Sequence, residues 1–435
     1  MIPFRLTLCI CLIFGCFEEN VAQNVAVNAQ RIESNFNKLK SFGDNQTIGN
    51  DRVAFSDYNV EALGWISDKL KAMGLTVTID FAGNLIAKRK GLDDSLPPIG
   101  FGSHIDCVPN GGHYDGQVGV LGGIEFLEYI TEKKIMTKHP LEFIIFSNEE
   151  GGVFGSRAIA GKINKEALEV MTASGYTNKE GMDRLGGNSA KVFEVARKKG
   201  AFHAFVELHI EQGGILEEER IDIGVVQGIV GLRWWDVKIK GFSNHAGTTP
   251  MNKRKDAMLA AAKFILDVNE VVRSFPGTQV GTVGRIKAMP GVPNVIPGEV
   301  VLSLELRDLK NEILDKLFDS IQEKAGLIEK QYSVNISFTP ISATGEPALT
   351  SLVLQDVIEN QARQLGYSSK RMPSGAGHDS QEMALIAPTG MLFVPSKGGI
   401  SHSPEEFTSP EAIVKGVNVL VGTLLKVDTM ESISY

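Results

Sequence analysis

Two adjacent glutamates, Glu149 and Glu150, follow an apolar run that ends at Phe146. Neighbouring carboxylates repel each other, and burying either of them is costly unless a cation or a proton offsets its charge. Further polar residues also follow apolar runs: His104, Asp106, His209, Glu211 and His402. Asp115 adds a carboxylate on the glycine-rich stretch GHYDGQVG. Imidazoles and carboxylates are ligands that suit Zn²⁺ or Mn²⁺, so these residue types predict a divalent-metal site.

The spacing of these residues also indicates the fold that must hold them. Apolar runs separated by helical stretches predict an α/β domain with a largely parallel sheet, which helices cover on both faces. Ligands of such sheets bind beyond the carboxyl ends of the strands, where these polar residues are expected. Any one of them alone is more often an ordinary surface residue, and an acidic pair is usually a solvated turn. Their convergence on one edge of the sheet is what favours a metal site.

A second pattern interrupts the first. Residues 227–341 are typical of strand, helix, two strands, helix and strand, which is a ferredoxin-like (βαββαβ) order. We therefore predict a catalytic domain made of residues 24–226 and 342–435, with residues 227–341 inserted as a smaller domain. Two domains also suit a chain of 435 residues.

The N-terminal residues differ from the rest of the chain. Arg5 precedes an apolar core from Leu6 to Phe14, which is too short to span a bilayer and has the length of a signal-peptide core. We predict that residues 1–23 are a signal peptide and that the protein is exported, to a periplasm, the exterior or a secretory lumen. A membrane anchor and a lipid attached to Cys16 are the alternatives.

Charge and cysteine content narrow the possible partners. The formal net charge is −8 and no basic block is present, which argues against nucleic acid and anionic membranes as partners. A small diffusible substrate fits this composition better. Cys107 is the one cysteine that follows the predicted signal peptide, so the mature chain cannot form an intramolecular disulfide.

The order of motifs resembles the metal-dependent amidohydrolases of the M20 peptidase superfamily. More narrowly, it is similar to the branch of N-carbamoyl-L-amino-acid hydrolases, β-ureidopropionases, allantoate amidohydrolases and ureidoglycolate amidohydrolases. The stretches that carry the resemblance are GSHIDCVPNGGHYDGQVGV, FSNEEGGVFGSR, ELHIEQGGILE, SNHAGTTPMNKRKDA, PNVIPGEV, LELRDL, SGAGHDSQ and FVPSKGGISHSPEE. They extend over nearly the whole chain after the predicted signal peptide.

The resemblance implies two divalent ions per subunit, Zn²⁺ or else Mn²⁺. Asp115 would bridge the ions, with one further pair of ligands on each: His104 and His209, and Glu150 and His402. Glu149 would not bind metal but would act as general base towards a metal-activated water. Asp106 lies two residues after His104 on a predicted strand, so both side chains leave one face, and its carboxylate could orient that imidazole.

The inserted domain would supply substrate contacts and, by resemblance, act as a lid and dimerisation domain. His245 would donate a hydrogen bond to the developing oxyanion, while Asn294 and Arg307 would hold a substrate carboxylate. Gln212 and Gly377 would line the pocket. Arg307 could instead form a salt bridge at a strand edge, and Asn294 could be a turn residue. In the family the lid histidine reaches a partner subunit's site, which implies a homodimer with shared active sites.

The expected reaction is hydrolysis of a linear amide or ureido C–N bond in a small carboxylate substrate, of the allantoate or N-carbamoyl-L-amino-acid type. A ureidoglycolate amidohydrolase, or an aminoacylase or dipeptidase of the same fold, is the alternative enzyme. A non-catalytic binding protein should have lost ligands or the base, yet all are present. The chain lacks the G-x-S-x-G elbow of serine hydrolases, and the glycines after Asp115 do not match the dinucleotide-binding fingerprint.

Overall fold

The computed structural model describes residues 25–45 and 49–435. The predicted signal peptide lies outside these residues. Within them the chain forms two compact units. Unit 1 comprises the chain up to Val225 together with Ser351–Arg371 and Ile386–Tyr435, and unit 2 comprises Val226–Thr350 and Met372–Leu385. Unit 2 thus contains the segment 227–341, extends beyond it to Thr350, and includes the separate stretch Met372–Leu385.

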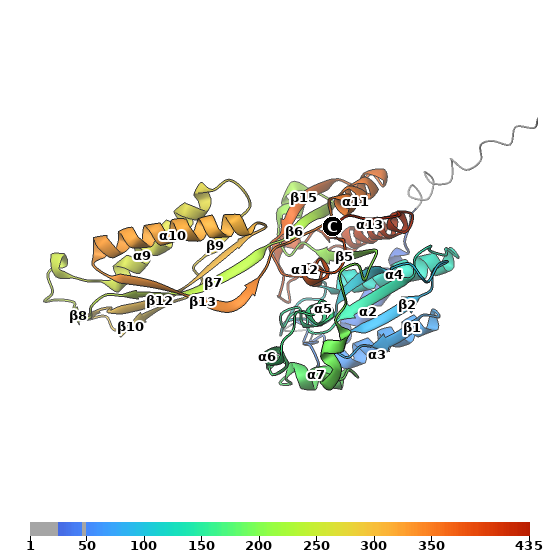
Figure 1. The fold of residues 1–435 in the computed structure, drawn as a ribbon, viewed down its shortest axis with the longest axis horizontal. Coiled ribbons are helices and arrows are strands. Elements are labelled where there is room, and N and C mark those ends of the chain that lie inside the picture. The colour runs from blue at the N-terminus through green and yellow to red at the C-terminus, as the bar shows by residue number, and fades with distance from the viewer. Residues whose placement is uncertain (1–24, 46–48) are drawn as a thin grey trace, which may run out of the picture. The chain divides into compact units, whose positions relative to one another are not determined.

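Unit 1 is built on a sheet whose centre is parallel (Figure 1). The central strands β4, β3, β5 and β16 lie in that order and run in one direction. The strands of unit 1 are β1 (Thr76–Ile79), β2 (Leu85–Arg89), β3 (Ile99–His104), β4 (Leu141–Phe146), β5 (Ala204–Ile210) and β16 (Thr389–Val394). The hairpin of β1 and β2 joins β4 antiparallel, and β6 (Ile223–Ile229) joins β16 antiparallel at the point where the chain leaves unit 1.

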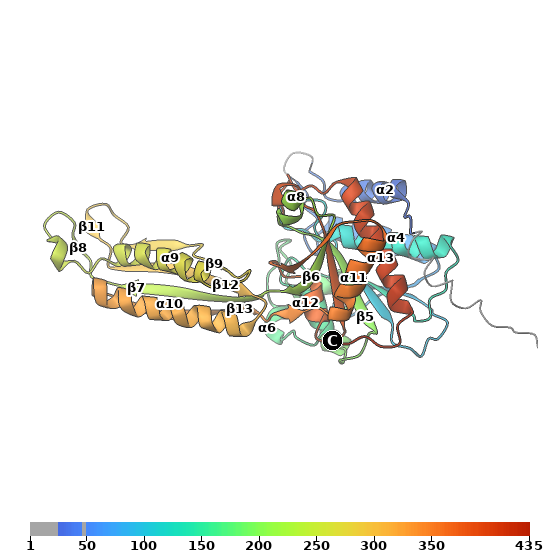
Figure 2. The same cartoon turned by 90° about the horizontal axis from the view of Figure 1, so that it is seen from above.

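Helices cover this sheet because its strands are apolar on both faces. Every residue of β3, β4, β5 and β16 is buried, as expected for parallel strands enclosed on two sides. Helices α2, α4, α11 and α13 pack against one another and form one layer (Figure 2). The helices of unit 1 are α2 (Ala29–Lys40), α3 (Asp57–Ala72), α4 (Gln117–Glu132), α5 (Phe154–Ile159), α6 (Lys165–Leu168), α7 (Asn178–Arg184), η1 (Ser189–Val195), α8 (Ile215–Glu219), α11 (Leu352–Gln364), η3 (Lys397–Gly399) and α13 (Pro410–Asp428). The predicted α/β class is therefore confirmed.

Unit 2 has the ferredoxin-like order expected for the inserted segment. Its antiparallel sheet has the order β10-β12-β7-β13, with β9 also paired to β12. The strands are β7 (Gly231–Lys240), β8 (Asn244–His245), β9 (Val280–Thr282), β10 (Ile286–Met289), β11 (Val295–Ile296), β12 (Glu299–Asp308), β13 (Asn335–Gly345) and β14 (Ala348–Leu349). The helices are η2 (Met251–Lys253), α9 (Ala257–Ser274), α10 (Asn311–Tyr332) and α12 (Asp379–Met383), and β15 (Ser369–Ser374) crosses the boundary between the units.

The pattern of burial in unit 2 follows from its single helical layer. Helices α9 and α10 pack on the sheet (Figure 2), and buried residues alternate with partly exposed residues along β12. Such alternation is typical of an antiparallel sheet that has one face in the core and one face in solvent.

In the described part of the chain, no helix combines the length and apolar character needed to cross a membrane.

Candidate metal centre and active site

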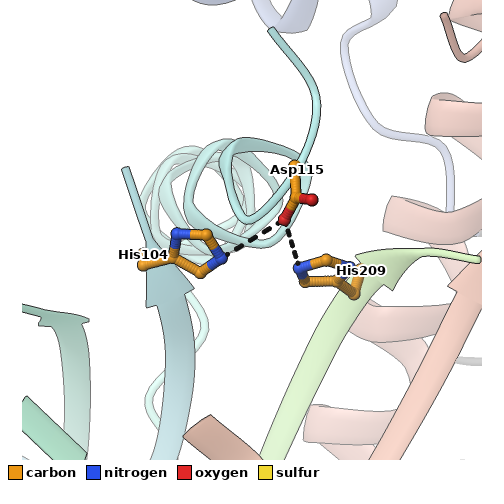
Figure 3. Close-up of side chains that lie close together, drawn as sticks. All are labelled: His104, Asp115 and His209. Carbon is orange, nitrogen blue, oxygen red and sulfur yellow. Dashed lines mark ion pairs between the residues drawn. The ribbon is translucent and has the colours of Figure 1, made fainter. Parts of the chain in front are cut away.

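The carboxyl ends of the central strands bring three predicted ligands together. His104 is the last residue of β3, His209 lies one residue before the end of β5, and Asp115 lies just before α4. Oδ1 of Asp115 is 3.4 Å from Nε2 of His104 and 3.2 Å from Nε2 of His209 (Figure 3). We call these three residues the first trio. Their ligand atoms all lie within 4.8 Å of one another.

A second trio shares Asp115 with the first. Nε2 of His402 is 3.3 Å from Oδ2 of Asp115 and 3.4 Å from Oε2 of Glu150. The ligand atoms of Asp115, Glu150 and His402 also lie within 4.8 Å of one another. Each trio therefore receives a different oxygen of the one aspartate. The grouping is the one that the family resemblance implies for two ions bridged by Asp115.

The two buried imidazoles of the first trio present their unprotonated nitrogens to Asp115. Nδ1 of His104 is 3.0 Å from the carbonyl oxygen of Asp106, and Nδ1 of His209 is 2.9 Å from that of Ile210. A carbonyl only accepts, so Nδ1 carries the proton and Nε2 offers a lone pair in the neutral ring. Nε2 of His104 has no hydrogen-bond partner among the described residues. Lone pairs that face a carboxylate need a proton or a cation between them, and a divalent cation fits this donor set.

The charges of the site also favour a cation. Burial, reinforced by the charge of Asp115, raises the pKa of Glu150 to about 7. Burial alone would raise the pKa of Asp115, but the three imidazoles that surround its carboxylate, those of His104, His209 and His402, hold it well below its ordinary value. The hydrogen bond to Asp115 raises the pKa of His402 to about 9. The carboxylates are thus stabilised by positive charge, which bound divalent ions would supply.

Glu149 lies beside the first trio but belongs to neither trio. Its side chain is 8% exposed, and its Oε2 is 3.6 Å from Nε2 of His104. The turn that carries it is held by its own carbonyl, which accepts the N–H groups of Gly152 and Val153 at 2.9 and 2.6 Å. Asn148 and Val153 both have positive φ, of 49° and 50°. A positive φ is unusual for Val153, because its side chain is β-branched. Such strain is found where a loop must aim side chains at a site.

Asp106 departs from the geometry that the sequence suggested. Strand β3 ends at His104, so the alternation of a strand does not extend to Asp106. The carbonyl oxygen of Asp106 takes the imidazole Nδ1–H, while the nearest carboxylate oxygen is 3.9 Å from that nitrogen. The carboxylate instead accepts the backbone N–H of Glu150 at 3.2 Å. Asp106 thus links the strand end of His104 to the turn of the two glutamates.

Gln212 contacts the shared ligand itself. Its Nε2 donates to Oδ2 of Asp115 at 2.6 Å, from a backbone with φ of 57°. Glu211 has a structural role, because its carboxylate accepts the N–H groups of Ile215 and Leu216 at the start of α8. It is not a ligand of either trio.

Two residues of the site were not singled out from the sequence. Glu406 is buried and accepts the N–H groups of Tyr114 and Asp115, and Ser401 contacts both Glu406 and Asp115. Both flank His402 in the stretch GISHSPEE, which was the available signal.

The other predicted site residues belong to unit 2, where His245 and Asn294 form one group. His245 lies on β8, is exposed and pairs with Val295. Its Nδ1 accepts the N–H groups of Gly247 and Thr248 at 3.0 and 3.2 Å, so Nε2 carries the proton of the neutral ring and can donate it. The carbonyl of Asn294 accepts the N–H of Ala246.

Arg307 contacts the stretch SGAG of unit 2, which contains Gly377. Arg307 donates from Nε to Oε1 of Glu305 at 2.7 Å and from Nη1 to the carbonyl of Gly375 at 2.6 Å. Arg307 pairs with Leu232 at the start of β7, whereas His245 lies beyond the other end of that strand (Figures 1 and 2). A strand of ten residues is about 30 Å long, so the two groups lie far apart within one subunit.

Comparison with known proteins shows the family of this chain. The profile of Peptidase family M20/M25/M40 matches residues 100–426. An N-carbamoyl-L-amino acid amidohydrolase of Geobacillus stearothermophilus is 39% identical over 403 residues, which cover 92% of this chain and 98% of the relative. A ureidoglycolate hydrolase of Arabidopsis thaliana is 39% identical over 427 residues, which cover 94% of this chain and 88% of the relative.

A solved structure has the same fold over almost its whole length. It is an amidase of the hydantoinase/carbamoylase family from Burkholderia multivorans, with 32% sequence identity and a TM-score of 0.87. The match covers 93% of this chain and 99% of that chain. With a family profile that matches most of its length and relatives of this similarity, the chain belongs to the M20 peptidase family.

Proposed function

We propose that this protein hydrolyses a linear amide or ureido C–N bond in a small substrate that carries a carboxylate. The observation that carries the proposal is the sharing of Asp115, which offers one oxygen to each of two ligand trios. Relatives named for N-carbamoyl-L-amino acids and for ureidoglycolate support a ureido substrate. Allantoate carries the same group and is a further candidate.

The residues of unit 1 supply the machinery for this reaction. Divalent ions at the two trios would polarise the scissile carbonyl and lower the pKa of water to about 7. Glu149, next to the first trio, would take a proton from the attacking water and return it to the leaving nitrogen. His104 and His209 would hold one ion, Glu150 and His402 the other, and Asp115 both. Zn²⁺ is the preferred ion and Mn²⁺ the alternative, because imidazole and carboxylate suit either.

The residues of unit 2 would bind the substrate. Two N–H groups of Arg307 contact Glu305 and Gly375, and the remaining N–H groups of its planar guanidinium would hold the substrate carboxylate. The Nε2–H of His245 is an exposed donor suited to an oxyanion. One such donor contributes about 3–4 kcal/mol to transition-state stabilisation. Asn294 would assist at the carboxylate, and Gln212 and Gly377 would line the pocket.

We further propose a homodimer in which each active site uses residues of both subunits. A single small substrate cannot contact both His245 and Arg307 of one subunit, since they lie about 30 Å apart along β7. Helix α9 also exposes an apolar stripe at helical spacing, formed by Leu259, Ala262 and Leu266, which a partner would cover.

Mixing two inactive variants tests the shared site. His245→Ala and Arg307→Ala subunits, mixed and allowed to exchange, should recover about a quarter of wild-type activity, because half of the dimers are mixed and each has one complete site. No recovery after demonstrated exchange would contradict the shared site.

The reaction itself is tested by measuring ammonia release. Metal-loaded protein should release ammonia from an N-carbamoyl-L-amino acid, N-carbamoyl-β-alanine, allantoate or ureidoglycolate, and protein treated with a chelator should not. An N-acetyl amino acid and a dipeptide serve as the competing substrates, and release of a free amino acid is measured for them because their hydrolysis yields no ammonia. Turnover of these two alone would assign the protein to the aminoacylase or dipeptidase alternative, and no turnover of any would favour a binding role.

Export by residues 1–23 remains a proposal that rests on the sequence. It predicts that the protein recovered from its native host lacks these residues, which N-terminal sequencing would check.

A further inference from the structure

We propose that Glu406 is a positioning residue that holds the two metal-binding trios in register. The inference rests on the proposed metal site, but it concerns a residue outside both trios. Glu406 is 4% exposed, and a buried carboxylate is costly unless hydrogen bonds satisfy it. Its contacts show what satisfies it.

One oxygen of Glu406 holds the backbone of the shared ligand. Oε1 accepts the N–H of Tyr114 at 2.8 Å and the N–H of Asp115 at 3.1 Å. The same segment packs closely against this oxygen, since a Cβ atom at Gly112 would lie 2.1 Å from it. The segment that carries Asp115 is therefore closely fitted to the Glu406 carboxylate.

The other oxygen of Glu406 reaches the side chain of the shared ligand through a hydroxyl. Oγ of Ser401 is 2.8 Å from Oε2 of Glu406 and 3.0 Å from Oδ2 of Asp115. That Oδ2 atom is the one that faces His402. The single hydroxyl proton of Ser401 thus lies between the two carboxylates, and Ser401 together with Gln212 restrains the rotation of the Asp115 side chain, which decides how its two oxygens divide between the trios.

Glu406 is also tied to the segment that carries His402. Its own N–H donates to the carbonyl of Ser403 at 3.0 Å, which closes a turn directly after His402, and its Oε2 contacts the hydroxyl of Ser401, directly before His402. His402 has a φ of 54°, a left-handed conformation that a non-glycine residue keeps only when its surroundings impose it. The carboxylate of Glu406 therefore connects the segment of His402 with the segment of Asp115.

These contacts argue that Glu406 acts through the ligands and not as a ligand. Its acceptors are already engaged by two N–H groups and a hydroxyl, and it belongs to neither trio. Partners that orient metal ligands typically contribute about 10- to 100-fold to metal affinity. We expect a loss of that size when Glu406 is changed.

The test compares Glu406→Gln with Glu405→Gln in the full-length protein. The two variants lose the same charge at adjacent positions, but Glu405 is exposed. In Glu406→Gln the amide oxygen can still accept the two N–H groups, but the NH₂ group would donate to Ser401, which reverses that hydrogen bond, and the negative charge beside Asp115 is lost. Dissociation constants for Zn²⁺ and Mn²⁺ are measured by competition with a chromogenic chelator, and the metal-free melting temperature reports on folding. We expect Glu406→Gln to bind about 10- to 100-fold more weakly, and Glu405→Gln to bind like the wild type.

A second variant keeps the proposal testable if Glu406→Gln also destabilises the metal-free fold. Ser401→Ala leaves both backbone contacts of Glu406 intact and removes the link to the Asp115 side chain alone. We expect it to weaken metal binding at an unchanged metal-free melting temperature. Wild-type affinity in Ser401→Ala, or in a well-folded Glu406→Gln, would overturn the positioning role. Absence of divalent-ion binding by the wild type would instead refute the proposed metal site.

Discussion

Replacing Glu149 by glutamine separates proton transfer from metal binding. Glutamine has nearly the same size, and the turn of Glu149 is held by backbone hydrogen bonds that the substitution leaves in place. Glu149 belongs to neither ligand trio, so both ions should stay bound. The amide cannot accept the proton of an attacking water. General bases contribute about 100- to 10,000-fold to turnover, which corresponds to about 3–5 kcal/mol of activation free energy.

The assay follows ammonia release at saturating substrate, and the metal content of the same sample is measured by elemental analysis. We expect kcat to fall by this factor while two ions per chain are retained. Glu150→Gln is the matched control: it removes a ligand of the second trio, so it should lose an ion as well as activity. Near-wild-type turnover of metal-loaded Glu149→Gln would refute the assignment of the base. Loss of an ion from this variant would show that Glu149 is a ligand.

Three further predictions concern other parts of the chain. Arg307→Ala should mainly raise KM for carboxylate substrates, and an unchanged KM in steady-state kinetics would exclude its anchoring role. In a metal titration, Gly116→Ala should weaken metal binding more than Gly175→Ala. Both positions have positive φ, but only at Gly116 would the Cβ meet the His104 ring, at 2.4 Å. Burial raises the pKa of Cys107 to about 12, so the native thiol should resist labelling at pH 8, and rapid labelling of the native protein would contradict this. The contribution of the buried thiol to the free energy of unfolding should be fully present below about pH 9 and should be lost as the pH rises towards 12, as measured by denaturant titrations.

The placement of the ligands was predictable because it follows from sheet topology. Parallel strands end at one edge, so His104 and His209, which end β3 and β5, had to lie near each other. The ferredoxin-like order of unit 2 was equally predictable, because stretches with the hydrophobic period of a helix alternate clearly with stretches typical of strands between β7 and β13.

The contacts that could not be predicted from the sequence depend on the paths of loops. Asp106 was expected on a strand, but β3 ends two residues earlier, and its carbonyl rather than its carboxylate meets the imidazole. The contact of Glu406 with Asp115 joins residues 291 positions apart and depends on the turn after His402. No local periodicity encodes such a contact. Its only trace in the sequence is an acidic residue close to a predicted ligand.

The separation of His245 from Arg307 could also not be predicted from the sequence. Both residues lie in the inserted segment, and only the register of β12 against β7 places them at opposite ends of the sheet. The proposed contacts of both residues with one small substrate would therefore need two subunits.

The central claim is that two divalent ions share Asp115, and anomalous diffraction from crystals grown with Zn²⁺ or Mn²⁺ tests it most directly. We predict two anomalous peaks per subunit, one among His104, Asp115 and His209 and the other among Asp115, Glu150 and His402. A single peak, or peaks elsewhere with these five side chains unliganded, would contradict the two-metal site.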